Sequence, residues 1–191
     1  MYSKKDNLII AFHGCKKSTL EQVLNHKSEI RQSSNDYDWL GSGIYFWEWN
    51  HQRAWEWANK KYGNEAAVLG AIISLGTCLD FLDTTYLNLL QPAYLRLQET
   101  YGSSNYNEFP KNTGFIDGIP TYRSLDCAVI NLIIRDAKRQ GQPFDSVRAA
   151  FWEGKEPYPH AGFKTANHIQ LSIINSNCIK GFFLPRERTS A

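Results

Sequence analysis

The chain has 191 residues, a mass of 21.9 kDa and a net charge of +2, which permits an anionic partner without requiring one. Hydrophobic residues make up 42% and charged residues 21%, ordinary proportions for a soluble globular protein with a buried core. The sequence shows neither a membrane-length apolar stretch nor the pattern of a signal peptide, so we expect a cytoplasmic protein with no membrane partner.

The cysteines are too scattered to form a recognisable metal or disulfide pattern. There is no C-x-x-C pair and no histidine at ligand spacing, and the four are Cys15, Cys78, Cys127 and Cys178. We interpret them as reduced, small core residues, and we expect no metal site.

The N-terminal part predicts a strand, a short helix and a loop. Residues 8–12 form an apolar run that predicts a buried strand ending at His13-Gly14. His13 is either a ligand-binding residue or a core-edge histidine that bonds a backbone carbonyl. Residues 18–24 predict a helix with a capping box at its start, and 27–38 a polar loop.

Residues 34–58 contain five of the six tryptophans and form the central stretch of the chain. Aromatic crowding of this kind marks either the thickest part of a core or a platform for a flat ring. Gly41 and Gly43 stand just before a strand-like run, where they allow a backbone approach that a Cβ would exclude. We interpret the stretch as a ligand platform built on a core strand.

The middle of the chain alternates strands and helices. Residues 43–48 predict a strand, and 50–62 a helix capped by its first residue, an asparagine, and ended by a glycine. A further strand is predicted over 66–75. Leucines and tyrosines at helical spacing predict an amphipathic helix over 84–101, broken or kinked near Pro92.

The C-terminal part predicts a long connection, a helix, a loop and a hairpin. Residues 102–122 are rich in Gly, Ser, Asn and Pro and predict an irregular connection. A helix is expected over 125–140 and a second long loop over 153–167. Strands over 168–174 and 178–184 are expected to pair as a hairpin across a three-residue turn. All elements together predict one α+β domain over residues 1–191.

The order of three short segments resembles the ADP-ribosyltransferase fold. They are Phe12-His13-Gly14, then the Gly-x-Gly-Ile-Tyr-Phe segment that contains Tyr45, and then a late strand with Gln170 near its start. The resemblance is to the His-Tyr-Glu branch typified by diphtheria toxin and the poly-ADP-ribose polymerases. It implies a single catalytic domain of two packed, mainly antiparallel sheets with flanking helices.

The resemblance also implies the substrate and the roles of the matching residues. NAD would be the co-substrate, with no metal. His13 would contact the adenosine ribose, Gly14 would meet the nicotinamide carboxamide through its backbone, and Tyr45 would stack on the nicotinamide ring. Gln170 stands where the family usually has the glutamate that holds the ribose 2′-hydroxyl and stabilises positive charge at C1′. Gly43 would belong to the nicotinamide-facing part.

Gln170 departs from the family pattern because it carries no charge. Either catalysis is limited to slow mono-ADP-ribosyl transfer, or a carboxylate reaches the site from elsewhere, for which Glu153 is the candidate. Alternatively, Glu153 forms a surface pair with Arg148, and Gln170 makes a core hydrogen bond. Asn35, Trp39 and Arg148 are further candidate NAD contacts.

The acceptor is expected to meet the loop over 158–166, where the family carries its target-recognition turn. Phe163 and Lys164 place an aromatic ring beside a cation, which suits an unstacked base and a phosphate, or a protein surface. The segment YDWLGSGIYFWE, together with the later segments HIQ and CIKGFF, also resembles small bacterial and phage-defence toxins of toxin–antitoxin systems. This resemblance implies RNA as the first candidate acceptor, protein as the second, and an antitoxin partner. An NAD hydrolase and an inactive NAD- or ADP-ribose-binding module remain alternatives.

Overall fold

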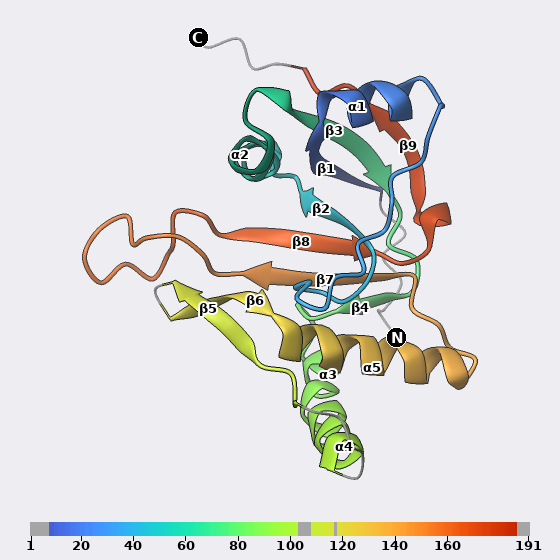
Figure 1. Ribbon diagram of the computed structural model, residues 1–191, viewed down its shortest axis with the longest axis vertical. Coiled ribbons are helices and arrows are strands. Elements are labelled where there is room, and N and C mark those ends of the chain that lie inside the picture. Colours follow the sequence, from blue (N-terminus) through green and yellow to red (C-terminus); the bar gives the residue numbers. More distant parts are fainter. Residues whose placement is uncertain (1–7, 103–107, 117, 187–191) are drawn as a thin grey trace.

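A computed structural model describes residues 8–102, 108–116 and 118–186. Seven strands form one sheet: β1 (Ile9–Lys16), β2 (Ile44–Glu48), β3 (Ala66–Ile73), β4 (Cys78–Asp80), β7 (Ser146–Phe151), β8 (His168–Ile173) and β9 (Ile179–Phe183). A separate hairpin consists of β5 (Asn112–Ile116) and β6 (Ile119–Arg123). The α-helices are α1 (Lys17–Leu24), α2 (His51–Tyr62), α3 (Thr84–Leu87), α4 (Leu90–Gly102) and α5 (Ser124–Arg139), with 3₁₀ turns at Gly63–Glu65 and Ser176–Cys178. The expected α+β class is confirmed (Figure 1).

The large sheet is continuous, in the order β4-β7-β8-β2-β1-β3-β9, where two packed sheets were expected. Its two halves meet at β1 and β2, which share only the pairs Ala11–Glu48 and Phe12–Trp47. By contrast, β1 and β3 pair over eight residues. The short β1–β2 ladder joins the halves into one sheet, and the second sheet is reduced to the β5–β6 hairpin.

Helices cover both faces of the sheet. On one face α1 packs over a core that includes Ala11, Phe46, Leu69 and Leu171. On the other face α2 packs on β1 and β3, while α5 packs on β7, as Figure 1 shows. The stretch of β2 and β8 between α2 and α5 is where the candidate site lies.

Several predicted boundaries are confirmed by local contacts. The Asn50 side chain accepts a hydrogen bond from the Arg53 N–H and caps α2, and Gly63 ends that helix with a positive φ of 54°. The predicted break in the following helix is also present, because α3 ends at Leu87 and α4 begins at Leu90. Pro92 lies in the first turn of α4, where a missing N–H is tolerated.

The predicted C-terminal hairpin is wrong. Both strands form, but β8 pairs with β2 and β7, whereas β9 pairs with β3 at the far edge of the sheet. Asn175 accepts a hydrogen bond from the Asn177 N–H and starts a 3₁₀ turn, which redirects the chain. Turn composition alone could not distinguish a hairpin from this crossing, because both need the same residues.

Three other local predictions need correction. The connection over 102–122 contains the β5–β6 hairpin, although 103–107 and 117 lie outside the described residues. Strand β1 continues past His13 to Lys16, because its pairing with β3 extends that far, so His13 is inside a strand. Helix α1 begins at Lys17, without the predicted side-chain cap.

The four cysteines have free thiols. Among the described residues, none of the helices is both long and apolar enough to cross a membrane.

We predict that Gly14→Ala destabilises the protein by about 1–3 kcal/mol, the usual cost of overpacking. A Cβ at this position would lie 2.6 Å from the Ala54 backbone oxygen and 3.0 Å from the Trp57 ring, so α2 would have to move away from β1. Gly181→Ala is the matched control, since a Cβ there meets nothing within 4 Å. Denaturation by urea measures both, and equal stability of the two variants would contradict the prediction.

Candidate functional site

The Tyr45 hydroxyl fixes the turn that precedes β2. It accepts a hydrogen bond from the Leu40 N–H (2.8 Å) and donates one to the Gly41 carbonyl (2.6 Å). Burial raises the pKa of the phenol, so the hydroxyl keeps its proton at neutral pH. The partly buried ring packs against the apolar cluster that includes Ile130 of α5. The Tyr45 hydroxyl therefore has a structural role, and only the partly exposed ring is available to contact a ligand.

The two glycines of the turn do allow a close backbone approach, as predicted, but the near neighbours are parts of the protein. A Cβ on Gly41, whose φ is +72°, would lie 2.6 Å from Asn131 Oδ1 on α5. A Cβ on Gly43 would lie 2.3 Å from Ser172 Oγ on β8. The turn thus needs glycine in order to pack between α5 and β8. A contact between Gly43 and NAD stays a prediction.

His13 lies beside Tyr45 but on the opposite face of the sheet. Its Nδ1 is 2.7 Å from the Tyr45 carbonyl oxygen, and its ring packs near Phe46. Burial lowers the pKa of His13, so the imidazole is neutral at pH 7. This contact is the backbone bond expected of a core-edge histidine. The neighbouring Gly14 is packed under α2, and the NAD contacts of both residues stay predictions.

Strand β8 carries a row of polar side chains on the face between α2 and α5. His168, Gln170 and Ser172 alternate along the strand, so they point to one side, and their exposed fractions are 8%, 7% and 0%. Gln170 is paired with Trp47, and Ser172 with Tyr45. Directly paired residues share a face, so Tyr45 and Gln170 are diagonal neighbours on it.

Five buried side-chain atoms on this face have no hydrogen-bond partner among the described residues, and one of them is Ser172 Oγ. The other four are Trp47 Nε1, Arg53 Nε, His168 Nε2 and Gln170 Oε1, and we call these four residues the inner polar cluster. Buried polar groups in proteins are almost always paired, because an unpaired group costs about 1–3 kcal/mol. Two of these atoms are N–H donors and the others accept, so the cluster has the hydrogen-bonding capacity to hold a polar ligand.

His168 is neutral, and its unprotonated Nε2 faces the cluster. Burial lowers its pKa, and its Nδ1 lies 2.9 Å from the Ala166 carbonyl oxygen. A neutral ring that donates from Nδ1 leaves Nε2 as an acceptor. The Glu153 carboxylate lies 3.6 Å from Nδ1 and works against the effect of burial on the pKa.

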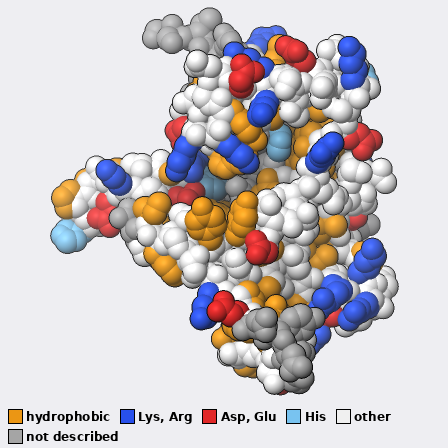
Figure 2. Space-filling model, in the orientation of Figure 1, with side chains coloured by type: hydrophobic (Ala, Val, Ile, Leu, Met, Phe, Trp, Pro, Cys, Tyr) orange, Lys and Arg blue, Asp and Glu red, His pale blue; other side chains and the backbone are white. Residues whose placement is uncertain are grey.

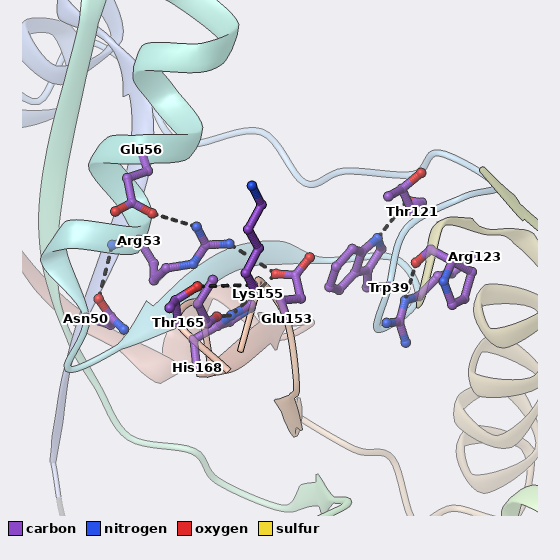
Figure 3. Close-up of polar contacts among 12 residues, drawn as sticks. Trp39, Asn50, Arg53, Glu56, Thr121, Arg123, Glu153, Lys155, Thr165 and His168 are labelled. Atoms are coloured by element: carbon purple, nitrogen blue, oxygen red, sulfur yellow. Dashed lines mark hydrogen bonds and ion pairs between the residues drawn. The ribbon is translucent and has the colours of Figure 1, made fainter. Parts of the chain in front are cut away.

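An ion pair joins α2 to the loop over 153–167 above His168. Arg53 Nη2 lies 3.0 Å from Glu153 Oε2, and Arg53 Nη1 lies 2.6 Å from Glu56 Oε2. Figure 3 shows Arg53 and Glu153 pointing toward one another, with His168 beneath them. The sequence placed Glu153 near the site, and the structure brings it to the inner polar cluster.

Arg148 does not form the alternative surface pair with Glu153. Its guanidinium makes a bidentate ion pair with Glu48 (2.6 and 2.7 Å) and a further contact with Asp80 (3.2 Å). Burial by itself would lower the pKa of Arg148, but the two carboxylates raise it. By strand alternation Arg148 lies on the face opposite Gln170, because Gln170 pairs with Ala149. The structure therefore does not bring Arg148 together with Tyr45 and Gln170.

Trp39 lies beside the inner polar cluster, in a stack of rings capped by a cation. Its ring centroid is 4.8 Å from that of Phe151 and 6.5 Å from that of His168, and the Arg123 guanidinium lies 4.2 Å above it. The indole N–H donates to the Thr121 carbonyl (3.0 Å). The structure thus places Trp39 beside the cluster, and its contact with NAD stays a prediction.

Asn35 is exposed in the same approach loop, away from these rings. Its amide nitrogen donates to Ser33 Oγ (2.9 Å), and its backbone N–H donates to Asp38 (3.1 Å). These contacts shape the loop, and an NAD contact of Asn35 stays a prediction.

No family model, curated protein or solved structure matches this chain. Within residues 8–102, 108–116 and 118–186 there is also no group of three or more His, Cys, Asp or Glu side chains placed to hold a metal ion.

The loop over 153–167 projects from the sheet between β7 and β8 (Figure 1). Phe163 is 65% exposed on it, and Lys164 Nζ lies 5.2 Å from the ring centroid of Trp152. Figure 2 shows Lys and Arg side chains above a band of apolar side chains on this face of the molecule. The ring that Lys164 contacts is therefore Trp152, where the sequence suggested Phe163, and the binding of an acceptor at this loop stays a prediction.

The sequence interpretation passed over Arg53, His168 and Arg123. His168 and Gln170 are two residues apart in a strand, so alternation could have placed both on one face. Arg53 and Arg123 reach the same place from helix α2 and from the end of strand β6, and nothing in their local sequence marks them. Only tertiary packing brings them together.

We predict that acidification destabilises the protein through its neutral buried histidines. Since the pKa values of His13 and His168 in the folded chain lie below the reference value of 6.5, the unfolded chain binds more protons below that pH. The free energy of unfolding should therefore fall as pH drops from about 7.5 to 5.5. Urea denaturation across this range tests it: His168→Gln should flatten the dependence, whereas His26→Gln, at an exposed position, should not.

Proposed function

We propose that this protein is an NAD-dependent mono-ADP-ribosyltransferase that binds NAD at the inner polar cluster. The observation that carries the proposal is the set of buried, unpaired donors and acceptors beside aromatic rings on β2 and β8. Flat rings and ribose hydroxyls are the two chemical features of a dinucleotide, and this site offers partners for both. The resemblance of the three short segments to ADP-ribosyltransferases also supports it.

The arrangement of the strands supports the expected roles of Tyr45 and Gln170, which are far apart in the sequence but share a face on the adjacent strands β2 and β8. His13, on the neighbouring β1, faces the other side of the sheet and has no role in the proposed complex. In the proposed complex the nicotinamide ring stacks on Tyr45, and Gln170 Oε1 accepts a hydrogen bond from the ribose 2′-hydroxyl. Trp47 Nε1 and Arg53 Nε donate to oxygen atoms of the substrate.

Access to these buried atoms requires side-chain rotation. The ring centroids of Trp47 and Phe151 lie 6.3 and 5.6 Å from that of His168, and the Arg53–Glu153 ion pair passes above it. Binding of a phosphate-bearing substrate gives Arg53 an alternative anionic partner. We propose that NAD opens this ion pair when it binds.

The proposed reaction breaks the bond between C1′ of the nicotinamide ribose and the ring nitrogen, and neutral nicotinamide leaves with the bonding electrons. Positive charge develops at C1′, as in glycoside hydrolysis, and Glu153 supplies the negative charge that Gln170 lacks. The acceptor nucleophile then bonds to C1′. Its proton passes to Nε2 of neutral His168 and on to solvent.

The acceptor in this proposal is a macromolecule, with an RNA base placed before a protein side chain. We further propose that the protein acts as a toxin with an antitoxin partner, and both points rest on the resemblance to toxin–antitoxin proteins. One observation favours a second candidate, an NAD- or ADP-ribose-binding module without catalysis. Gln170 is neutral and lacks the negative charge of the glutamate that the family usually has at this position.

Incubation with labelled NAD tests the proposal. The protein is assayed alone and with total RNA, with DNA and with cell extract, and nicotinamide release and labelled macromolecule are measured separately. We expect both signals in the presence of an acceptor. Release without a labelled macromolecule would identify an NAD hydrolase, and binding without release would identify the binding module.

We predict that Gln170→Met has opposite effects on stability and activity. Methionine has a similar size and removes the unpaired amide oxygen, so the free energy of unfolding should stay equal or rise by about 1 kcal/mol. Transfer should fall about 100-fold, because the ribose loses a positioning contact. Gln98→Met, at an exposed position of α4, is the matched control and should change neither. Full activity of Gln170→Met would refute the assignment of Gln170.

A further inference from the structure

A second concave surface adjoins the inner polar cluster and shares His168 with it. It is a groove of about 450 Å³ at the ends of β2, β7 and β8. Ala150 and Ile169 form its floor; they are directly paired and face away from Phe151 and His168. We call it the outer groove, and its edges carry Trp49, Asn50, Trp152 and Asn167.

Two tryptophans of the outer groove are exposed to solvent. Trp49 is 65% exposed and Trp152 is 55% exposed, although indole rings are usually buried in a monomeric protein. They follow β2 and β7 directly, so the ends of two strands hold both indoles at the groove.

Trp49 is also held in a strained backbone conformation. Its φ is +52°, a left-handed value that is rare for a bulky residue. The Trp49 N–H donates to the Ile10 carbonyl (3.0 Å), which keeps this conformation in place. Backbone strain of this kind is concentrated at functional sites, and here it keeps an indole in solvent beside the groove.

The charges in and beside the groove are paired, so its specificity rests on rings and amides. Glu48 lines the groove and is bound bidentately by Arg148, and Lys164 over the Trp152 ring is paired with Glu156 at 3.4 Å. The Asn50 Oδ1 caps α2, which leaves its NH₂ group as a donor, while Asn167 has a donor and an acceptor.

We propose that the outer groove binds an unstacked nucleobase between Trp49 and Trp152. Indole faces stack on any base, and amide side chains match the donor and acceptor edge of a base such as adenine. Lys164 lies beside Trp152, where a phosphate attached to the base would displace Glu156 from it. This site adjoins the one assigned to NAD chemistry and shares His168 with it, but base binding does not depend on turnover of NAD.

The nucleobase can come from two sources, a single-stranded nucleic acid or the adenine end of NAD. Phe151 and His168 line the groove and also contact the ring stack of Trp39, so the two sites adjoin. Competition distinguishes the sources. If the strand binds equally well in saturating NAD, the base belongs to the strand, and if NAD displaces it, the groove holds adenine of the dinucleotide.

The test is binding of a fluorescein-labelled single-stranded adenine oligonucleotide to the full chain, measured by anisotropy, with AMP and NAD as competitors. Trp152→Ala should weaken binding about tenfold or more, since one base loses its stacking partner. Trp49→Gly should do the same without loss of stability, because glycine adopts the positive φ freely. Trp55→Ala is the matched control, an exposed tryptophan on α2 away from the groove residues.

Unchanged affinity in both Trp152→Ala and Trp49→Gly would overturn the proposal, as would the absence of any binding by oligonucleotide, AMP and NAD. A glucose oligomer that quenches the tryptophan fluorescence when nucleotides do not would also overturn it, because the groove would then be a sugar site. Failure of the labelled-NAD assay alone would leave this proposal standing, since none of these measurements requires turnover.

Discussion

The position of β8 between β2 and β7 is the constraint on which the candidate site depends. A strand with neighbours on both sides and helices over one face cannot keep its side chains in water, yet this strand carries His168, Gln170 and Ser172 on one side. Removing these groups from water costs free energy, and the packing of the apolar residues around them offsets that cost. Their burial lowers the pKa of His168 and leaves Gln170 with an unpaired oxygen.

Ion pairs on opposite faces of the sheet organise the surroundings of β8. On one face the Arg53–Glu153 pair connects α2 with the loop over 153–167, and on the other face Arg148 binds Glu48 and Asp80. Partly buried ion pairs of this kind resist separation, because removing one partner leaves the other charge desolvated. Each network lies beside one place where a ligand is proposed, because Glu153 contacts His168 of the inner polar cluster and Glu48 lines the outer groove.

Local signals predicted most individual elements of the fold but not their partners. The Asn50 cap and the helix break near Pro92 depend on contacts within a few residues, and both are confirmed. The prediction of a C-terminal hairpin was wrong because strand pairing depends on the whole sheet, in which β9 pairs with β3. Glu153 was placed near the site by its loop, whereas its partner Arg53 is 100 residues away and could not be inferred.

The sequence by itself determined the α+β class, most of the helices and strands, and the stretch around Gly41, Gly43 and Tyr45, because periodicity, capping and turn chemistry act over short distances. Only the tertiary structure decided what those residues touch. The glycines pack against α5 and β8, and the Tyr45 hydroxyl is used within its own turn. Burial and unpaired polar atoms are properties of packing between distant segments, so the inner polar cluster and the outer groove became visible only in three dimensions.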